Sequence, residues 1–154
     1  MQIIFIDNST DLTATSLNIK ALDSIQKILI NFSIELSEKN HEVTIYNRAK
    51  HKKIDKGVKW KNISDLNYNP VDIIIFVQDT DLLKYKVKAK IKFLLLHYKP
   101  PDVLNKHTLI DLIKQKVCIL YSNNYVISSL PENYKYVPKL FLKIGVSENF
   151  KETG

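Results

Sequence analysis

Short apolar runs alternate with amphipathic stretches along the whole chain. Residues 2–6 form a β-branched run that Asp7 and Asn8 end, which predicts a buried strand. In residues 16–39 the apolar positions recur every three or four residues, which predicts a helix with one buried face. A second strand is expected directly afterwards, at residues 42–46, so the order favours parallel pairing with a right-handed crossover. The apolar positions of the helix are Leu22, Ile25, Leu29, Phe32 and Leu36.

The helix over residues 16–39 carries signals at both ends, and the alternation continues after it. Thr15 or Ser16 can cap its start, and Asn40 can take the left-handed conformation that ends it. The later apolar runs predict strands at 58–63 (an edge strand), 72–77, 90–97, 117–121 and 139–146, and helices at 80–85, 104–116 and 123–130.

This regular alternation predicts an α/β fold. We expect a single Rossmann-like domain, with an open, mostly parallel sheet and helices on both faces. The domain should span residues 1–146, and the polar residues 147–154 read as the start of a linker or a disordered tail.

Composition excludes several classes of function. No apolar run reaches the roughly 18 residues of a membrane span, and the N-terminus has no signal-peptide pattern. The single cysteine, Cys118, excludes an internal disulfide, and the four histidines lack metal-ligand spacing, so we expect a cytoplasmic protein without a metal. The net charge is +7, but no basic helix or aromatic platform accompanies it, so nucleic-acid binding is not expected.

Candidate site residues follow from the ends of the predicted strands, because ligands of open α/β sheets bind outside the carboxyl ends of the strands. Each of these polar residues either contributes to a site or simply ends its strand. His97 is the most informative, since a stiff Pro-Pro loop follows it and imidazole can hydrogen-bond a substrate or move a proton near neutral pH; the alternative is a histidine bonded within its loop. The candidates are Asp7, Asn8, Asn47, Arg48, Gln78, Asp79, His97, Tyr98, Ser122 and Asn123.

A basic cluster follows the second strand and has two interpretations. It forms either a docking patch for an anionic membrane surface, which would make the protein peripheral at the membrane, or a solvated surface loop. Its members are Arg48, Lys50, Lys52, Lys53 and Lys56.

Several segments together resemble the N-terminal domain of GT-B glycosyltransferases. The stretch ALDSIQKILINFSIELSEKNHEVTIY is similar to the first helix and second strand of that family, with His41-Glu42-Val43-Thr44 beginning the strand. The segments DIIIFVQ and KFLLLHYKPP resemble paired strands of which the second ends in a cleft histidine. VCILYSNNYVISSL and KYVPKLFLKIGVSENF are similar to the last strands of the domain and the link to the second domain.

The resemblance implies transfer of a sugar from a nucleotide-sugar donor to a sugar or lipid-linked acceptor. The domain would shape the acceptor side, with His97 and Ser122 at the cleft, while a separate C-terminal domain would bind the donor; no other cofactor is implied. We therefore expect the 154 residues to be inactive alone.

Two departures from the family separate this chain from a typical member. The loop after the first strand has no glycine, and Ile144 and Ser147 replace the linker asparagine and aspartate. The alternative function is a free-standing, non-catalytic module that binds a glycan, a lipid or a protein. A receiver-like domain ranks lower, because Asp7 and Asp79 alone are too few acidic residues for one.

Overall fold

The computed structural model describes residues 1–9, 12, 22–50, 52–98 and 106–143. Within these residues, eight strands form one sheet of order β3-β4-β2-β1-β5-β6-β7-β8, and every neighbouring pair is parallel except β3 and β4. The strands are β1 (Gln2–Ile6), β2 (Glu42–Asn47), β3 (Lys53–Asp55), β4 (Val58–Asn62), β5 (Val71–Val77), β6 (Ala89–Leu96), β7 (Val117–Tyr121) and β8 (Lys139–Phe141).

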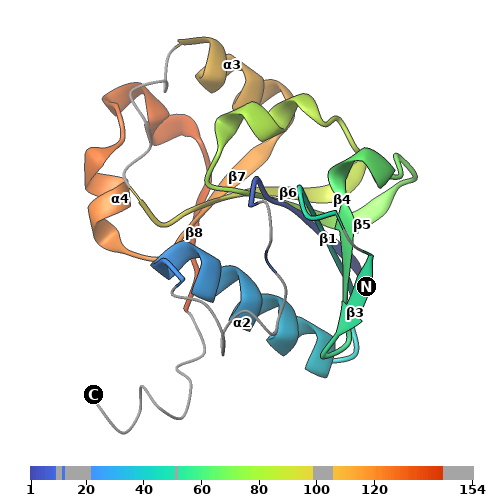
Figure 1. Ribbon diagram of the computed structural model, residues 1–154. Coiled ribbons are helices and arrows are strands. Elements are labelled where there is room, and N and C mark those ends of the chain that lie inside the picture. The colour runs from blue at the N-terminus through green and yellow to red at the C-terminus, as the bar shows by residue number, and fades with distance from the viewer. Residues whose placement is uncertain (10–11, 13–21, 51, 99–105, 144–154) are drawn as a thin grey trace, which may run out of the picture.

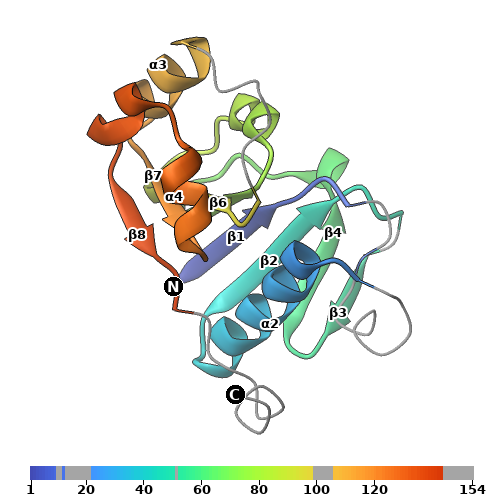
Figure 2. The same ribbon diagram turned by 90° about the vertical axis from the view of Figure 1, so that its left-hand side faces the viewer.

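Helices pack on both faces of this sheet (Figure 1). Helix α2 (Ser24–Glu38) lies along β2 and β4 on one face, as Figure 2 shows, and its apolar residues join the inward side chains of the strands there. The other face is covered by α3 (Lys106–Lys114), α4 (Asn124–Ser129) and the 3-10 helices η2 (Thr80–Lys84) and η3 (Glu132–Tyr136). The structure thus confirms a single α/β domain of Rossmann type.

Helix α2 begins later than the apolar spacing predicts. Its N-cap is Asp23, whose carboxylate accepts a hydrogen bond from the Gln26 amide while the Gln26 side chain accepts one from the Asp23 amide. This capping box fixes the start, so the predicted start at residue 16 is wrong: Leu22 and Asp23 precede the helix. Thr15 and Ser16 lie outside the described residues. Asn40 has a φ of 67°, as expected of the residue that ends the helix.

Four further elements differ from the sequence prediction. The antiparallel strand β3 was not expected; it is joined to β4 by Lys56 and Gly57, whose positive φ values of 50° and 79° make a tight hairpin turn. The predicted helix at 80–85 is a 3-10 helix capped by Asp79, and η3 was not expected. Strand β8 ends at Phe141 rather than running on through Lys143, and residues 144–146 lie outside the described part.

The strand order places a topological switch point between β1 and β5. From β1 the chain first adds β2 and β4 on one side, and then returns to add β5, β6, β7 and β8 on the other. The chain therefore leaves the carboxyl ends of β1 and β5 in opposite directions, and the carboxyl ends at such a switch point are where α/β sheets commonly bind ligands.

The return from β4 to β5 contains only the short 3-10 helix η1 (Ile63–Asp65) and a loop. One face of β1, β2 and β4 therefore has no α-helix from this crossover.

Candidate functional site

The switch point is bridged by polar side chains from both strands. The Asn8 side-chain amide, after β1, donates a hydrogen bond to the Asp79 carboxylate, after β5. The Arg48 Nε donates to the side-chain oxygen of Asn8, Oδ1, at 3.3 Å. The other Asp79 oxygen accepts from the Asp81 amide at 2.9 Å, which caps η2. These contacts draw the ends of β1, β2 and β5 together into one rim.

Asp7 is a half-buried carboxylate at the end of β1. Burial raises its pKa above the ordinary value, because the charged form loses hydration; the nearby Asp23 carboxylate acts in the same direction. Hydrogen bonds from the Ser9 hydroxyl and amide to the carboxylate oppose this shift in pKa without cancelling it. Ionisation of Asp7 in this environment therefore lowers the stability of the folded protein.

We expect Asp7→Asn to raise the free energy of unfolding at neutral pH. Because the folded pKa of Asp7 is raised, its favourable contribution is present below the unfolded pKa and is lost as pH rises through the folded pKa. The difference between variant and wild type should therefore grow with pH in urea unfolding followed from about pH 4 to about pH 8. Glu38→Gln, an exposed control on α2, should show no such growth. A constant difference for Asp7→Asn across this range would contradict the argument.

His97 and Ser122 form a pair at the ends of β6 and β7. The His97 Nδ1 lies 2.5 Å from the Ser122 hydroxyl oxygen. Asn123 supports the pair, because its amide donates to the His97 carbonyl at 2.6 Å while its oxygen accepts from the Val126 amide and caps α4. No described residue bonds to the Nε2 atom of His97, so this nitrogen is available to a ligand.

The pKa of His97 is lowered by burial, which penalises the imidazolium. The charge of Asp23 acts in the opposite direction on this pKa. The shift favours a neutral imidazole near neutral pH, and such a ring can accept or donate a hydrogen bond at Nε2 depending on its tautomer.

Gln78 fixes the backbone that carries His97. It adopts a φ of 61°, and its side-chain oxygen accepts from the His97 and Tyr98 amides at 2.9 and 3.1 Å. Its side-chain nitrogen donates to the Tyr98 carbonyl at 3.2 Å. Gln78 is therefore a positioning residue that joins the ends of β5 and β6.

Tyr98 occupies the start of α2. Its hydroxyl oxygen accepts hydrogen bonds from the Ser24 and Ile25 amides at 3.1 and 3.4 Å, while Asp23 takes the Gln26 amide at 3.0 Å. The first amides of a helix usually offer an anion site. Here the side chains of Tyr98 and Asp23 already accept hydrogen bonds from three of these amides.

The structure brings most of the predicted residues together at the carboxyl edge. Asp7, Asn8 and Asp79 meet at the switch point, and His97, Ser122 and Asn123 meet beside it. Two contributors were missed: Asp23, whose Asp-x-x-Gln spacing is the capping signal that could have found it, and Ser9. Asn47 is fully buried and has a structural role instead.

Within the described residues, Lys56 lies apart from the rest of the basic cluster. Arg48 follows the carboxyl end of β2, whereas Lys56 lies in the hairpin turn before β4, at the opposite end of the sheet. Lys52 and Lys53 pair with Asp65 and Asp55 at 3.7 and 3.8 Å. Lys50 is exposed.

The described residues contain neither a metal-binding cluster nor a membrane-spanning helix. No group of three or more His, Cys, Asp or Glu side chains is placed to hold a metal ion there. None of the described helices has the length and apolar character needed to cross a membrane.

Comparison with known proteins identifies no family for this chain. No protein-family model matches the chain, and a search of curated proteins finds no significant match.

Proposed function

We propose that this chain is the acceptor-side domain of a nucleotide-sugar-dependent glycosyltransferase, and that its carboxyl edge binds a sugar acceptor. One observation carries the proposal: a half-buried carboxylate with a raised pKa and a half-buried imidazole with a lowered pKa both lie within the electrostatic influence of Asp23 at the start of α2. Carboxylate, imidazole and amide groups are the partners that sugar hydroxyls need, because hydroxyls both donate and accept hydrogen bonds.

The occupied start of α2 favours a neutral sugar over a nucleotide at this edge. Tyr98 and Asp23 use the Ser24, Ile25 and Gln26 amides, which would otherwise hold a phosphate. The acidic groups Asp7, Asp23 and Asp79 would also repel one. The nucleotide-sugar donor would then be bound by a second domain.

In this proposal His97 contacts the acceptor through Nε2, while Ser122 orients the ring through Nδ1. Asp7 accepts a hydrogen bond from an acceptor hydroxyl, and its raised pKa suits it to take up the proton of that hydroxyl. Gln78 and Asn123 are positioning residues, because they bond to the backbone of residues 97–98 rather than to the ligand.

We expect neutral methyl glycosides to bind at the carboxyl edge of the purified chain. Nitrogen-15-labelled protein would be titrated with methyl glucoside, methyl galactoside and methyl N-acetylglucosaminide. Saturable shifts should centre on the amides of Asn8, Gln78, His97 and Tyr98. His97→Ala should weaken binding by roughly tenfold, since one hydrogen bond contributes about 1–1.5 kcal/mol. His107→Ala, an exposed histidine on α3, is the matched control and should bind as the wild type does.

The proposal fails if none of these sugars gives a saturable shift at the carboxyl edge, or if His97→Ala binds as tightly as the control. A spectrum with native dispersion for His97→Ala separates loss of the contact from loss of the fold.

The alternative, a non-catalytic binding module, is favoured by the mutual bonding of Asn8, Asp79 and Arg48. It predicts sugar binding at the carboxyl edge but no transfer activity, even when a donor-binding domain is supplied.

A further inference from the structure

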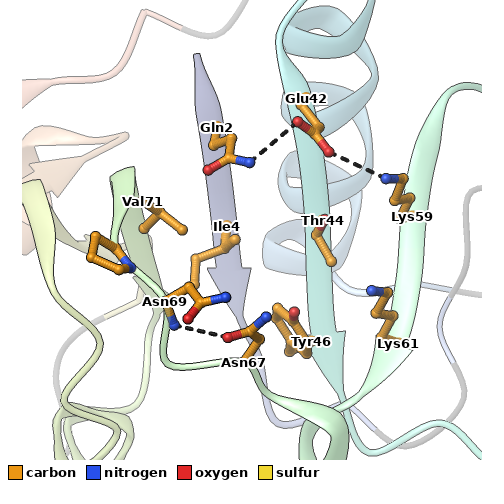
Figure 3. A pocket seen from close by; sticks show the side chains of 11 residues that line it. Gln2, Ile4, Glu42, Thr44, Tyr46, Lys59, Lys61, Asn67, Asn69 and Val71 are labelled. Atoms are coloured by element: carbon orange, nitrogen blue, oxygen red, sulfur yellow. Dashed lines mark hydrogen bonds and ion pairs between the residues drawn. The ribbon is translucent and has the colours of Figure 1, made fainter.

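A hollow lies on the face of the sheet that the β4–β5 crossover leaves without an α-helix. Its floor is made by side chains of β1, β2 and β4, and the loop before β5 forms its wall (Figure 3). Its volume is about 190 Å³, below the roughly 300–1,000 Å³ of pockets for drug-sized ligands, which limits the occupant to about the size of one monosaccharide. The lining residues are Gln2, Ile4, Glu42, Thr44, Tyr46, Lys59, Lys61, Asn67, Asn69, Pro70 and Val71.

The sequence of the strands makes this face polar. In β4, Val58 and Trp60 point into the core beneath α2, whereas Lys59 and Lys61 alternate with them and point into the hollow. In β2, Val43 and Ile45 belong to the same core, while Thr44 and Tyr46 line the hollow beside the two lysines. Such alternation is typical of a sheet face that meets solvent or a ligand rather than a helix.

Two hydroxyl groups in the floor have no partner among the described residues. Thr44 is 9% exposed and Tyr46 is 5% exposed, so both side chains are more than nine-tenths buried. The only described side-chain nitrogen or oxygen that is both sealed from solvent and unbonded is the Trp60 Nε1, so the two hydroxyls open onto the hollow. Both hydroxyl groups are therefore accessible from the hollow and free to form hydrogen bonds with a ligand that enters it.

The charge of the hollow is positive. Lys59 is paired with Glu42 at 3.2 Å, and Glu42 also accepts from Gln2 at 3.4 Å. Lys61 has no ion-pair partner among the described residues, and it stands next to Tyr46 in the register of β2 and β4. The side-chain amides of Asn67 and Asn69 add further donors from the loop. Among the described residues, the unbonded groups of the hollow are thus the Lys61 ammonium and hydroxyl and amide groups that can donate hydrogen bonds.

We propose that this hollow binds a small anion that carries hydroxyl groups, namely a phosphorylated or carboxylated monosaccharide. Lys61 pairs with the anionic group, while the Thr44 and Tyr46 hydroxyls and the Asn67 and Asn69 amides bond to the remaining oxygens. This site is distinct from the carboxyl edge, because its residues come from the sheet face and the loop before β5. The proposal does not depend on the glycosyltransferase function.

Titration of the labelled chain with four compounds tests the proposal: glucose 6-phosphate, glucuronate, inorganic phosphate and glucose. We expect saturable shifts at Thr44, Tyr46, Lys61 and Asn69 with the phosphorylated or the carboxylated sugar, and the better binder identifies the anionic group. Inorganic phosphate should bind more weakly than the better sugar because it lacks the additional hydroxyls, and glucose should not bind here. Added salt should weaken binding.

Lys61→Gln should lower the affinity for the charged sugar at least about tenfold, because a hydrogen bond between charged groups contributes more than one between neutral groups. Tyr46→Phe should lower it several-fold. Lys114→Gln, which removes an exposed lysine of α3, is the matched control and should not change the affinity. The proposal is overturned if glucose binds as tightly as the charged sugars, if Lys61→Gln binds like the control, or if no compound shifts these amides.

Discussion

Trp60→Ala should lower the free energy of unfolding by about 3–5 kcal/mol, the largest effect that we expect from a single substitution. Trp60 is 1% exposed and lies in β4, where its ring fills the core beneath α2 between β2 and the edge strand β3. Truncation would leave a cavity that the sheet cannot close, because parallel strands on one side and the hairpin on the other hold the backbone in place.

Trp60→Phe should cost far less, below about 1.5 kcal/mol. The Trp60 Nε1–H is buried and has no acceptor among the described residues. Phenylalanine removes this unpaired N–H and with it the cost of its desolvation, and this gain offsets part of the packing lost with the larger ring. Urea unfolding followed by circular dichroism would measure both variants, since Trp60 is the only tryptophan and fluorescence would be lost.

Tyr136→Ala, at a residue that is 75% exposed, serves as the control for Trp60 and should stay within about 0.5 kcal/mol of the wild type. If Trp60→Phe proved as costly as Trp60→Ala, the indole N–H would have an acceptor, and the argument from its missing partner would be wrong.

Asn47→Ala should lower the free energy of unfolding by about 2–4 kcal/mol. Asn47 is fully buried at the end of β2; its oxygen accepts from the Ala49 amide at 2.9 Å, and its nitrogen donates to the Leu12 carbonyl at 3.1 Å. Alanine would leave both backbone groups buried without their partners, and each such group costs about 1–3 kcal/mol.

The same substitution should loosen the segment that follows Asp7. The Leu12 side chain is buried in the core under α2, and the Ser9 carbonyl accepts from the Arg48 amide at 2.8 Å, so Asn47 and Arg48 together anchor this segment to β2. Hydrogen exchange at the Ala49 amide should become faster in Asn47→Ala. The control is Asn124→Ala, at an exposed asparagine, which should change stability by less than about 0.5 kcal/mol. Equal effects of the two variants would contradict the role assigned to Asn47.

The sequence was sufficient to predict those elements whose periodicity follows from burial. Strands β5 and β7 are apolar runs because both faces of the sheet are covered along them, and the predicted bounds of β1, β5 and β7 differ by at most one residue from the observed ones. Strand β3 was missed because its three residues, Lys-Ile-Asp, carry no burial pattern; the turn at Lys56 and Gly57 holds it in place. The start of α2 was placed too early because apolar spacing continues through Leu22, whereas the capping box at Asp23 decides the boundary.

At the candidate site, the sequence predicted the residues but not their contacts. The strand-end rule predicted which residues lie at the carboxyl edge, but not which of them meet, because the pairing of Asn8 with Asp79 depends on β1 lying beside β5. The pairing of His97 with Ser122 depends in the same way on the order of β6 and β7. The hollow was missed because it arises from a crossover without a helix, a feature that no single residue encodes.

The phenol of Tyr98 has a consequence for selectivity. Because its oxygen already holds two amides at the start of α2, an anion that needed those amides would have to break two hydrogen bonds before forming its own. A neutral ligand beside the phenol has no such cost. The fold can therefore discriminate against nucleotides and other phosphates at this edge because the amides that would bind them are already occupied, in addition to the repulsion by the acidic groups there.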